Sequence, residues 1–311
     1  MSETLAFFSE FDPFEDWRAA LAPHLGSEVR IENHDAITDP ESVRYALVWM
    51  PPDGFFDRFP NLSLVINLGA GVDRLVARTD LPDVPITRLS DPEMGRMMAG
   101  FVLFAVLRHA REIPRFEAAQ AIREWAYAHP RPAHQISVAV LGLGELGAVA
   151  AAEIARFGFA THGWATRPRD IPGVISHYGD AALVEVLSLA DIVVSMLPLT
   201  PRTRKLIDAS HFGKMKPGAA FVNVSRGEVV DEDALVQALQ IGYLSGATLD
   251  VFETEPLPPD HPLWSIPGVL ITPHLASVAL PKSAAPQIAA NIRAIRTGGP
   301  VVNTVSRVHG Y

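Results

Sequence analysis

The fold is decided by one stretch of sequence, Val138-Ala139-Val140-Leu141-Gly142-Leu143-Gly144-Glu145-Leu146-Gly147. It joins an apolar strand to a Gly-x-Gly-x-x-Gly loop, and the alanine-rich stretch 148–156 that follows predicts a helix. Gly142 permits a tight turn, Gly144 lets the backbone approach a pyrophosphate, and Gly147 lets helix and strand pack closely. The free N–H groups and the positive dipole end of the helix would then face the phosphates.

A glycine-rich turn that binds no ligand is the competing explanation for an isolated Gly-x-Gly-x-x-Gly. Here the strand before the loop, the helix after it and a second apolar run at Ala160–Trp164 supply the context that the motif requires. Four more strands are predicted at Ile192–Met196, Ala219–Val224, Gly246–Leu249 and Val269–Thr272. Six strands with intervening helices favour a doubly wound parallel sheet that binds a dinucleotide.

The first hundred residues alternate short apolar runs with polar, proline-rich joints. Strands are predicted at Leu5–Phe8, Val29–Ile31, Ala46–Trp49 and Leu64–Leu68. A helical stretch such as Phe14–Leu25 falls between them, and parallel strands need such crossovers. Because 311 residues exceed what one core usually serves, we expect a separate, smaller α/β domain here.

Three further helical stretches are predicted. The first runs from about Pro92 to Leu107, and its apolar part, Met97–Leu107, should be buried; the second continues to about Ala128. These two offer more apolar surface than one sheet face needs to cover, so we expect a homodimer. The third begins near Pro281 or Pro286, reaches Arg296 and should return the chain to the first domain.

Composition narrows the class of protein. With 26 basic and 35 acidic residues the formal net charge is -9, and no basic run exists, so nucleic acid is not expected as a partner. The chain has no cysteine, which excludes disulfides and thiolate ligands, and we expect no metal site. The apolar Met97–Leu107 is too short to cross a membrane, and the acidic residues 1–16 contradict a secretory signal. We therefore expect a cytoplasmic protein without a membrane partner.

Residues suited to acid–base chemistry follow three successive predicted strands. Arg226 follows the strand that ends at Val224, Glu255 comes a few residues after Asp250, and His274 comes directly after Thr272-Pro273. Ligands bind outside the carboxyl ends of such strands. Reduction of a 2-oxo acid needs a cation for the carboxylate, a proton donor for the carbonyl oxygen, and a group that holds the donor. Each residue alone could equally be a solvated or packing group.

Taken together, the motifs resemble the D-isomer-specific 2-hydroxyacid dehydrogenase family, and most closely its glyoxylate/hydroxypyruvate reductase A branch. The resemblance covers nearly the whole chain. Its markers, besides the glycine loop, are Trp49 with Pro51-Pro52, Leu68–Asp73, Asn223–Gly227, Leu249–Phe252 running to Glu255–Pro258, Pro262–Trp264, Thr272–His274, and the ending from Val305 with Arg307, Gly310 and Tyr311.

The resemblance implies a fold and an activity. A Rossmann-type dinucleotide-binding domain, residues 99–285, would be inserted into a smaller flavodoxin-like substrate (lid) domain, residues 1–98 and 286–311. The activity would be NAD(P)H-dependent reduction of small 2-oxo acids, glyoxylate and hydroxypyruvate, to 2-hydroxy acids. The same family contains transcriptional corepressors, so a dinucleotide-sensing interaction protein without turnover is the alternative.

The resemblance also implies residue roles. Arg226, Glu255 and His274 would be catalytic, and Arg226 would also bind substrate. The loop Gly69 to Val72 would offer the N–H groups of Ala70, Gly71 and Val72 to the substrate carboxylate, although a mere tight turn would explain its glycines equally well. Trp49 would wall the pocket or belong to the core. The cofactor would contact Gly142, Gly144, Glu145, Leu146, Gly147, Thr166, Arg167, Arg169, Leu197, Pro198, Thr203, Val224, Ser225 and Asp250, the last near the nicotinamide amide.

The turn after the second strand predicts the choice of cofactor. In NAD-selective members an acid about 20 residues after the glycines binds the ribose hydroxyl and repels a 2′-phosphate. That position is Ala165 here, and Thr166, Arg167 and Arg169 follow it. We therefore expect NADPH to be preferred, with NADH possible. The alternative is that both arginines are solvated and that Asp170 serves as the acid at the end of a longer strand.

One departure from the family pattern lies in the long helix. Residues Ala99-Gly100 stand where the family usually has Ala-Glu, and nothing in the sequence explains what replaces that carboxylate. A formate dehydrogenase of the same family would carry glutamine at the position of Glu255, so that residue argues against this activity.

Overall fold

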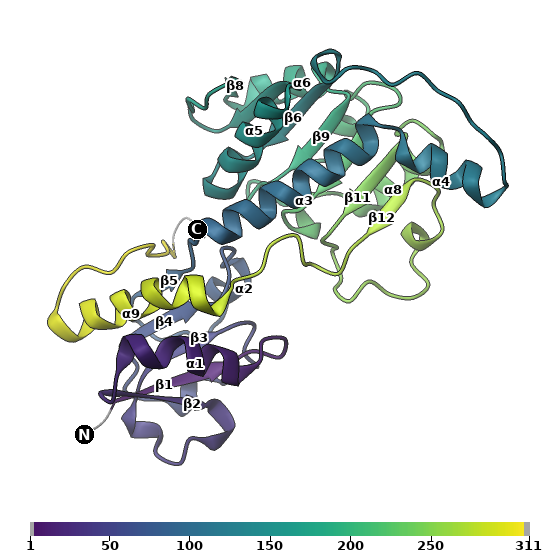
Figure 1. Cartoon of the computed structure of the whole chain (residues 1–311). Helices are drawn as coiled ribbons and strands as arrows, with labels where there is room; N and C mark the ends of the chain where they lie inside the picture. The colour runs from purple at the N-terminus through teal and green to yellow at the C-terminus, as the bar shows by residue number, and fades with distance from the viewer. Residues whose placement is uncertain (1–2, 308–311) are drawn as a thin grey trace. The chain divides into compact units, whose positions relative to one another are not determined.

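The computed structural model describes residues 3–307, which form two compact units, each with its own parallel sheet (Figure 1). Met1–Met94 with Val278–Tyr311 make the first unit, and Gly95–Ser277 the second. The boundaries predicted from the sequence, at 98/99 and 285/286, lie four and eight residues further along the chain than those of the structure. The predicted class, two α/β domains of which one is inserted into the other, is confirmed. The marker residues Gly310 and Tyr311 lie outside the described part of the chain.

The first unit has a five-stranded parallel sheet in the order β2-β1-β3-β4-β5, which is the flavodoxin order. Its strands are β1 (Glu3–Phe8), β2 (Val29–Asn33), β3 (Val43–Val48), β4 (Leu64–Asn67) and β5 (Ile86–Arg88). The last strand was not predicted, because Ile-Thr-Arg is too short and too polar to form an apolar run. Its helices are α1 (Phe14–Leu25), α2 (Asp73–Val76) and α9 (Pro281–Thr297). Helix α9 packs against α1, so the predicted return of the chain is confirmed (Figure 1).

The second unit has a seven-stranded parallel sheet in the order β12-β11-β10-β9-β6-β7-β8. Its strands are β6 (Ser137–Leu141), β7 (Ala160–Ala165), β8 (Val174–Tyr178), β9 (Ile192–Ser195), β10 (Ala220–Asn223), β11 (Gly246–Leu249) and β12 (Val269–Ile271). Counted from β6, this is the doubly wound order 3-2-1-4-5-6 with one strand added. The six predicted strands are present, and the prediction of only six was wrong because β8 was missed.

Helices cover both faces of this second sheet. They are α3 (Pro92–Ala110), α4 (Ile113–Ala121), α5 (Glu145–Phe157), α6 (Asp180–Leu189), α7 (Ala209–Phe212) and α8 (Glu232–Gln240). In β6, Ala139 and Leu141 pack with α6, while Val138 and Val140 pack with α3 and α5. A strand buried on both faces reads as a continuous apolar run, which is why β6 was clear in the sequence.

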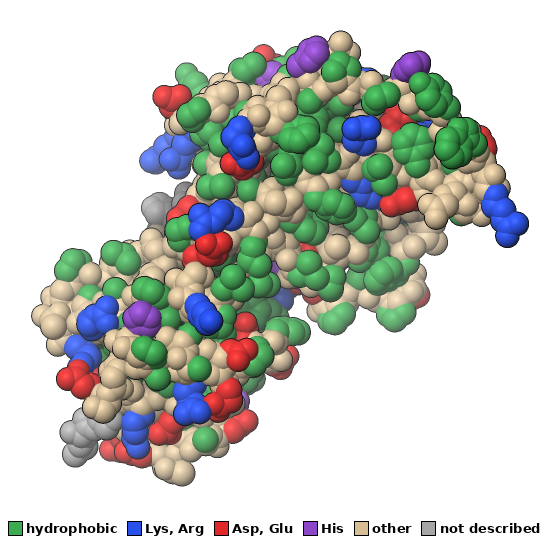
Figure 2. All heavy atoms as spheres, in the orientation of Figure 1, with side chains coloured by type: hydrophobic (Ala, Val, Ile, Leu, Met, Phe, Trp, Pro, Cys, Tyr) green, Lys and Arg blue, Asp and Glu red, His purple; other side chains and the backbone are tan. Residues whose placement is uncertain are grey.

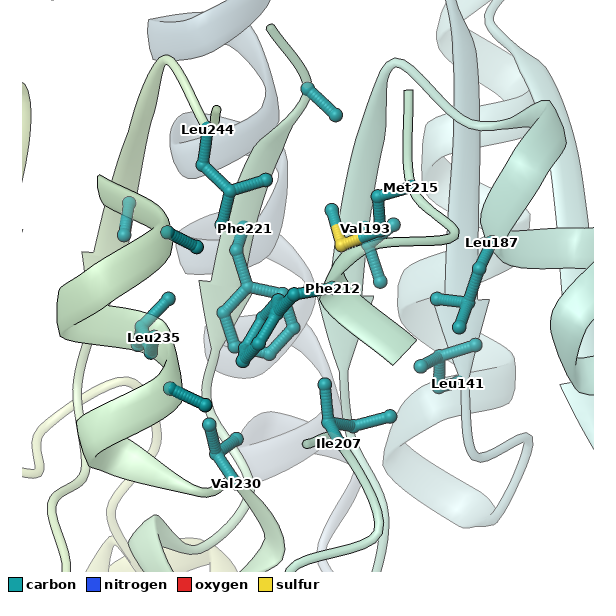
Figure 3. Packing of buried hydrophobic residues seen from close by; sticks show 14 of the residues in the cluster. Leu141, Leu187, Val193, Ile207, Phe212, Met215, Phe221, Val230, Leu235 and Leu244 are labelled. Atoms are coloured by element: carbon teal, nitrogen blue, oxygen red, sulfur yellow. The ribbon is translucent and has the colours of Figure 1, made fainter. Parts of the chain in front are cut away.

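The core on the α6 and α8 side is filled by large side chains (Figure 3). The rings of Phe212 and Phe221 lie 5.4 Å apart and nearly perpendicular, at 86°. Leu187, Val193 and Leu235 belong to the same cluster. Burial of this apolar surface is the main favourable term in folding, and it fixes the sheet whose carboxyl edge carries the site.

Helix α3 is anchored to the sheet by polar contacts. Its buried Arg108 donates hydrogen bonds to Glu117 of α4 at 2.8 Å and to the carbonyl oxygen of Gly268 at 3.2 Å. His109 bonds to Thr248 of β11 at 3.0 Å. Burial, assisted by the charge of Arg108, lowers the pKa of His109 to about 4, so this histidine is neutral near pH 7.

Two helix predictions were wrong in part. The second helix was expected to continue to about Ala128, but α4 ends at Ala121. Arg123, with φ 59°, takes a left-handed conformation that a helix cannot continue through. Met97–Leu107 was expected to be buried, yet one side of α3 is open: Phe104 is half exposed, and a side chain at Gly100 would meet nothing within 4 Å.

Within residues 3–307, no helix combines the length and apolar character needed to cross a membrane. In the same part of the chain, no group of three or more His, Asp or Glu side chains is arranged to hold a metal ion.

Candidate active site

The glycine loop between β6 and α5 is shaped by two close backbone approaches. Gly142 has φ 99°, and a Cβ there would lie 2.6 Å from the carbonyl oxygen of Met196. A Cβ on Gly147 would lie 1.9 Å from the carbonyl oxygen of Gly142. Gly144 caps α5 without a side-chain hydrogen bond and has open space around it, so the first N–H groups of α5 can bind a phosphate. Glu145 and Leu146 are the first residues of that helix. The loop fits the pyrophosphate of a dinucleotide.

The turn after β7 carries the predicted cofactor-selecting residues. The strand ends at Ala165, as far along as the predicted acid position, so the alternative of a longer strand that ends near Asp170 is wrong. Thr166, Arg167 and Arg169 are exposed. The edge of the sheet next to the glycine loop therefore presents two guanidinium groups and no strand-end carboxylate.

The loop after β9 contains Leu197, Pro198 and Thr203. The Thr203 hydroxyl donates to the carbonyl oxygen of Pro198 at 2.6 Å and accepts from the N–H of Thr200 at 2.8 Å. Thr203 therefore holds this loop together through hydrogen bonds within the loop, whether or not it also contacts a ligand. Leu197 is buried in the core.

Arg226 is positioned by a buried asparagine, Asn223, to which the sequence assigned no role of its own. Asn223 ends β10, and its amide donates to the carbonyl oxygen of Arg226 at 3.1 Å. Its side-chain oxygen accepts from the Ser225 N–H at 3.2 Å and from the Ser225 hydroxyl at 2.7 Å. Val224 and Ser225 are buried, and Ser225 also bonds to Ser195 at 2.9 Å. The turn that carries Arg226 is thus held from inside the sheet.

The loops that carry Arg226 and Glu255 are in direct contact at Gly227. A Cβ on this glycine would lie 1.8 Å from the carbonyl carbon of Phe252 and 2.2 Å from the nitrogen of Glu253. Only glycine permits so close an approach of two backbones. Residues from the ends of β10 and β11 are thereby brought together.

His274 and Glu255 form the predicted pair. The His274 Nδ1 lies 3.0 Å from Oε2 of Glu255, whose Oε1 accepts a hydrogen bond from the N–H of Phe252 at 3.1 Å. Both side chains are partly buried. Because Nδ1 is bonded to the carboxylate, Nε2 is the ring nitrogen available to exchange a proton with a substrate.

Asp250 fixes the backbone around His274. Its buried carboxylate accepts hydrogen bonds from the Thr272 hydroxyl at 2.6 Å and from the N–H groups of Leu275 and Ala276, both at 2.9 Å. Its carbonyl oxygen accepts from the His274 N–H at 2.9 Å, and His274 has φ 53°. Asp250 therefore anchors the backbone of His274, a role that the sequence did not indicate; its contact with the nicotinamide stays a prediction.

The first unit brings together Trp49 and the loop Gly69 to Val72. A Cβ on Gly69 would lie 2.4 Å from the Trp49 ring, so the indole packs directly on this loop. The amide of buried Asn67 donates to the carbonyl oxygens of Gly69 and Gly71, both at 2.9 Å. In a trans peptide the N–H points opposite to the C=O, so the N–H groups of Ala70 and Val72 point away from Asn67. This is more than a tight turn, because an internal side chain sets which way the N–H groups face.

Comparisons with known proteins agree with this arrangement. The family model described as D-isomer specific 2-hydroxyacid dehydrogenase, NAD binding domain, matches residues 103–276. A protein named glyoxylate/hydroxypyruvate reductase A from Serratia proteamaculans is 37% identical over 314 residues, 99% of each chain.

Two solved structures are similar over the whole chain. A D-isomer specific 2-hydroxyacid dehydrogenase from Xanthobacter autotrophicus Py2, in complex with NADPH and MES, is 57% identical with a TM-score of 0.95 and full coverage of both chains. An NADPH-dependent glyoxylate/hydroxypyruvate reductase from Sinorhizobium meliloti, in complex with NADP and sulfate, is 33% identical with a TM-score of 0.93, again over 100% of each chain.

Proposed function

Because the chain belongs to the D-isomer specific 2-hydroxyacid dehydrogenase family, we propose that it reduces small 2-oxo acids, glyoxylate and hydroxypyruvate, with NADPH as the reductant. The observation that carries this proposal is the His274–Glu255 pair, 3.0 Å apart, on loops that follow neighbouring strands of a dinucleotide-binding sheet. The unit Gly95–Ser277 would bind the cofactor through the predicted residues, from Gly142 to Asp250.

The chain's own residues divide the work of the reaction. The imidazolium of His274 donates a proton from Nε2 to the carbonyl oxygen, and Glu255 holds the ring in the orientation for this transfer. Arg226 binds the substrate carboxylate through paired charge-assisted hydrogen bonds and polarises the carbonyl group. The N–H groups of Ala70, Gly71 and Val72 are the further proposed carboxylate ligands, with Trp49 beside them. Bound NADPH supplies the hydride.

Turnover tests the proposal directly. The purified protein should oxidise NADPH when glyoxylate or hydroxypyruvate is added. The loss of absorbance of the reduced nicotinamide measures this oxidation. A dinucleotide-sensing interaction protein would bind NADPH and leave it reduced. The relatives named as reductases over nearly the full chain favour turnover over that alternative.

Cofactor preference should depend on the turn after β7. Changing Arg167→Ala together with Arg169→Ala should raise KM for NADPH roughly tenfold or more and change KM for NADH about twofold at most. Each guanidinium contact with a 2′-phosphate contributes about 1.5–3 kcal/mol when shielded and less at an exposed turn, and about 1.4 kcal/mol is a factor of ten.

The matched control is Arg156→Ala. Arg156 is an exposed arginine in the last turn of α5, where it pairs with Glu153, and it should not alter the ratio of the two KM values. Equal wild-type efficiency with NADPH and NADH would contradict the assigned preference.

We propose a homodimer formed through the surface of α3 and the stretch after α4. Hydrophobic side chains gather over α3 and α4 in Figure 2. Trp125 is 95% exposed, Ile122 71% and Tyr127 70%, and Phe104 belongs to the same region of the chain. Exposed apolar side chains gathered on one face are typical of an interface, and a second copy of the chain is the partner that two-fold symmetry makes commonest.

Light scattering of the wild type at micromolar concentration should give twice the chain mass of 33.7 kDa. Trp125→Glu with Tyr127→Glu should shift the mass toward that of one chain. Ile241→Glu is the control, because Ile241 is 79% exposed in the turn after α8 and should leave the mass unchanged. A wild-type mass of one chain would refute the dimer.

We also propose that the protein works in the cytoplasm. The absence of cysteine is compatible with a reducing compartment.

A further inference from the structure

Arg88, the last residue of β5, lies in the first unit and has no part in the site described so far. Its backbone is fixed on both sides: its N–H donates to the carbonyl oxygen of Asn303 at 3.0 Å, and its carbonyl oxygen accepts from the Gln287 side chain at 2.8 Å. The start of its side chain is therefore held in place by residues from the far end of the sequence.

The side chain of Arg88 reaches the loop Gly69 to Val72. Arg88 is paired with Asn67 in the parallel ladder between β4 and β5, so the two side chains leave the sheet on the same face. Asn67 holds the loop from within, and Nη1 of Arg88 lies 3.4 Å from the carbonyl oxygen of Ala70. Trp49, the loop and Arg88 thus follow or end three adjacent strands, β3, β4 and β5.

The charge of Arg88 is not neutralised within its unit. Among residues 3–307, no carboxylate forms an ion pair with it, and the nearby Asp91 bonds instead to the N–H of Glu93 and to Ser283. A guanidinium has five N–H donors, and one long bond to a carbonyl leaves most of them unused. Arg88 is half-buried, so these unused donors remain accessible and can hydrogen-bond to a polar or anionic ligand.

We propose that Arg88 is a specificity residue that binds the hydroxyl group on the third carbon of a 2-oxo acid. The inference rests on the proposed function, in which the N–H groups of Ala70 to Val72 bind the carboxylate at the first carbon. Arg88 contacts this loop at the carbonyl oxygen of Ala70, and its remaining donors, at the end of a long side chain, would extend past the loop to the other end of so small a substrate. Hydroxypyruvate carries a hydroxyl at this carbon, pyruvate carries only hydrogens there, and glyoxylate has no third carbon. A site built to hydrogen-bond a hydroxyl rejects the analogue that lacks it.

Kinetics of Arg88→Met test the proposal, because methionine keeps an unbranched side chain and carries no N–H donor. With saturating NADPH, kcat/KM for hydroxypyruvate should fall roughly thirtyfold, while the values for glyoxylate and pyruvate should change about threefold at most, in line with the loss of one charged hydrogen bond. The ratio of hydroxypyruvate to pyruvate should therefore fall toward one. Arg58→Met, at an exposed arginine of the same unit that bonds to the His34 carbonyl oxygen, should leave this ratio unchanged.

An equal loss for all three substrates would overturn the inference, because it would mean that Arg88 supports the loop or binds the common carboxylate. An unchanged ratio would overturn it as well. If a thermal unfolding curve shows that Arg88→Met is not folded, Arg88→Lys replaces it in the test. Lysine keeps a donor in poorer geometry and should lower kcat/KM for hydroxypyruvate alone, by roughly threefold to tenfold. A wild type that turns over neither glyoxylate nor hydroxypyruvate would refute the proposed function instead.

Discussion

Replacing His274 by alanine is expected to lower kcat for glyoxylate reduction by about three orders of magnitude, because a positioned general acid contributes roughly 10²–10⁴-fold. The imidazole is held by Glu255 at 3.0 Å and by no residue of the glycine loop, so NADPH binding should stay within about twofold of wild type. Steady-state kinetics and a fluorescence titration of NADPH measure the two quantities.

His211→Ala is a matched control for this experiment. His211 forms a similar pair with Asp208, 2.8 Å apart, on the short helix α7 outside the candidate site, and its loss should leave kcat nearly unchanged. Of the two alanine variants, only His274→Ala should show the large loss of turnover. Near-normal turnover by the variant would show that another group donates the proton.

Arg226→Lys is expected to lower kcat/KM for both glyoxylate and hydroxypyruvate by about 10²-fold, although the charge is kept. A guanidinium binds a carboxylate through two parallel hydrogen bonds, and a lysine ammonium cannot reproduce that geometry. The loss of one charge-assisted bond, with poorer geometry of the one that lysine keeps, amounts to about 3 kcal/mol, or two factors of ten.

The loss should be equal for the two substrates, because both carry the carboxylate, and this separates Arg226 from the selective effect proposed for Arg88. Arg204→Lys, at an exposed arginine in the loop after β9, is the control and should keep wild-type efficiency. A loss of less than about tenfold in Arg226→Lys would mean that the substrate carboxylate is bound elsewhere.

The elements that could be predicted are those whose burial requires a run of apolar residues in the sequence. Strand β6 is covered on both faces and reads as an apolar run, and the glycines that follow it are required by backbone contacts. Strand β8 was missed because Val174–Tyr178 is an edge strand with mostly exposed side chains, so its Val-Ile-Ser-His-Tyr sequence shows no core pattern. Such a strand is held by its backbone bonds to β7, which carry no sequence signal.

The residues proposed as catalytic could be named singly from the sequence, but most of the contacts that support them could not. Glu255 and His274 stand at strand ends, where the topology brings them together, but the contact of Gly227 with Phe252 depends on three-dimensional packing. Asn67 did leave a local signal. It ends a strand, and its amide donates to carbonyl oxygens two and four residues further on. Asn223 also ends a strand; its side-chain oxygen accepts from the N–H two residues on, and its amide donates to the carbonyl oxygen three residues on. Asparagine is known for such local bonds.

The left-handed backbone conformation of His274 lowers the stability of the fold at a residue that we propose to be needed for activity. For a residue with a Cβ this conformation costs roughly 1–2 kcal/mol, and the hydrogen bonds to Asp250 offset that cost. Glycine would adopt the same backbone without strain, so the residue that suits the fold best at this position is not the one that we propose as the proton donor. Selection for heat resistance alone would therefore favour replacement of His274. A library screened only for thermal stability would enrich variants that lack this histidine and, on the proposed function, lack activity.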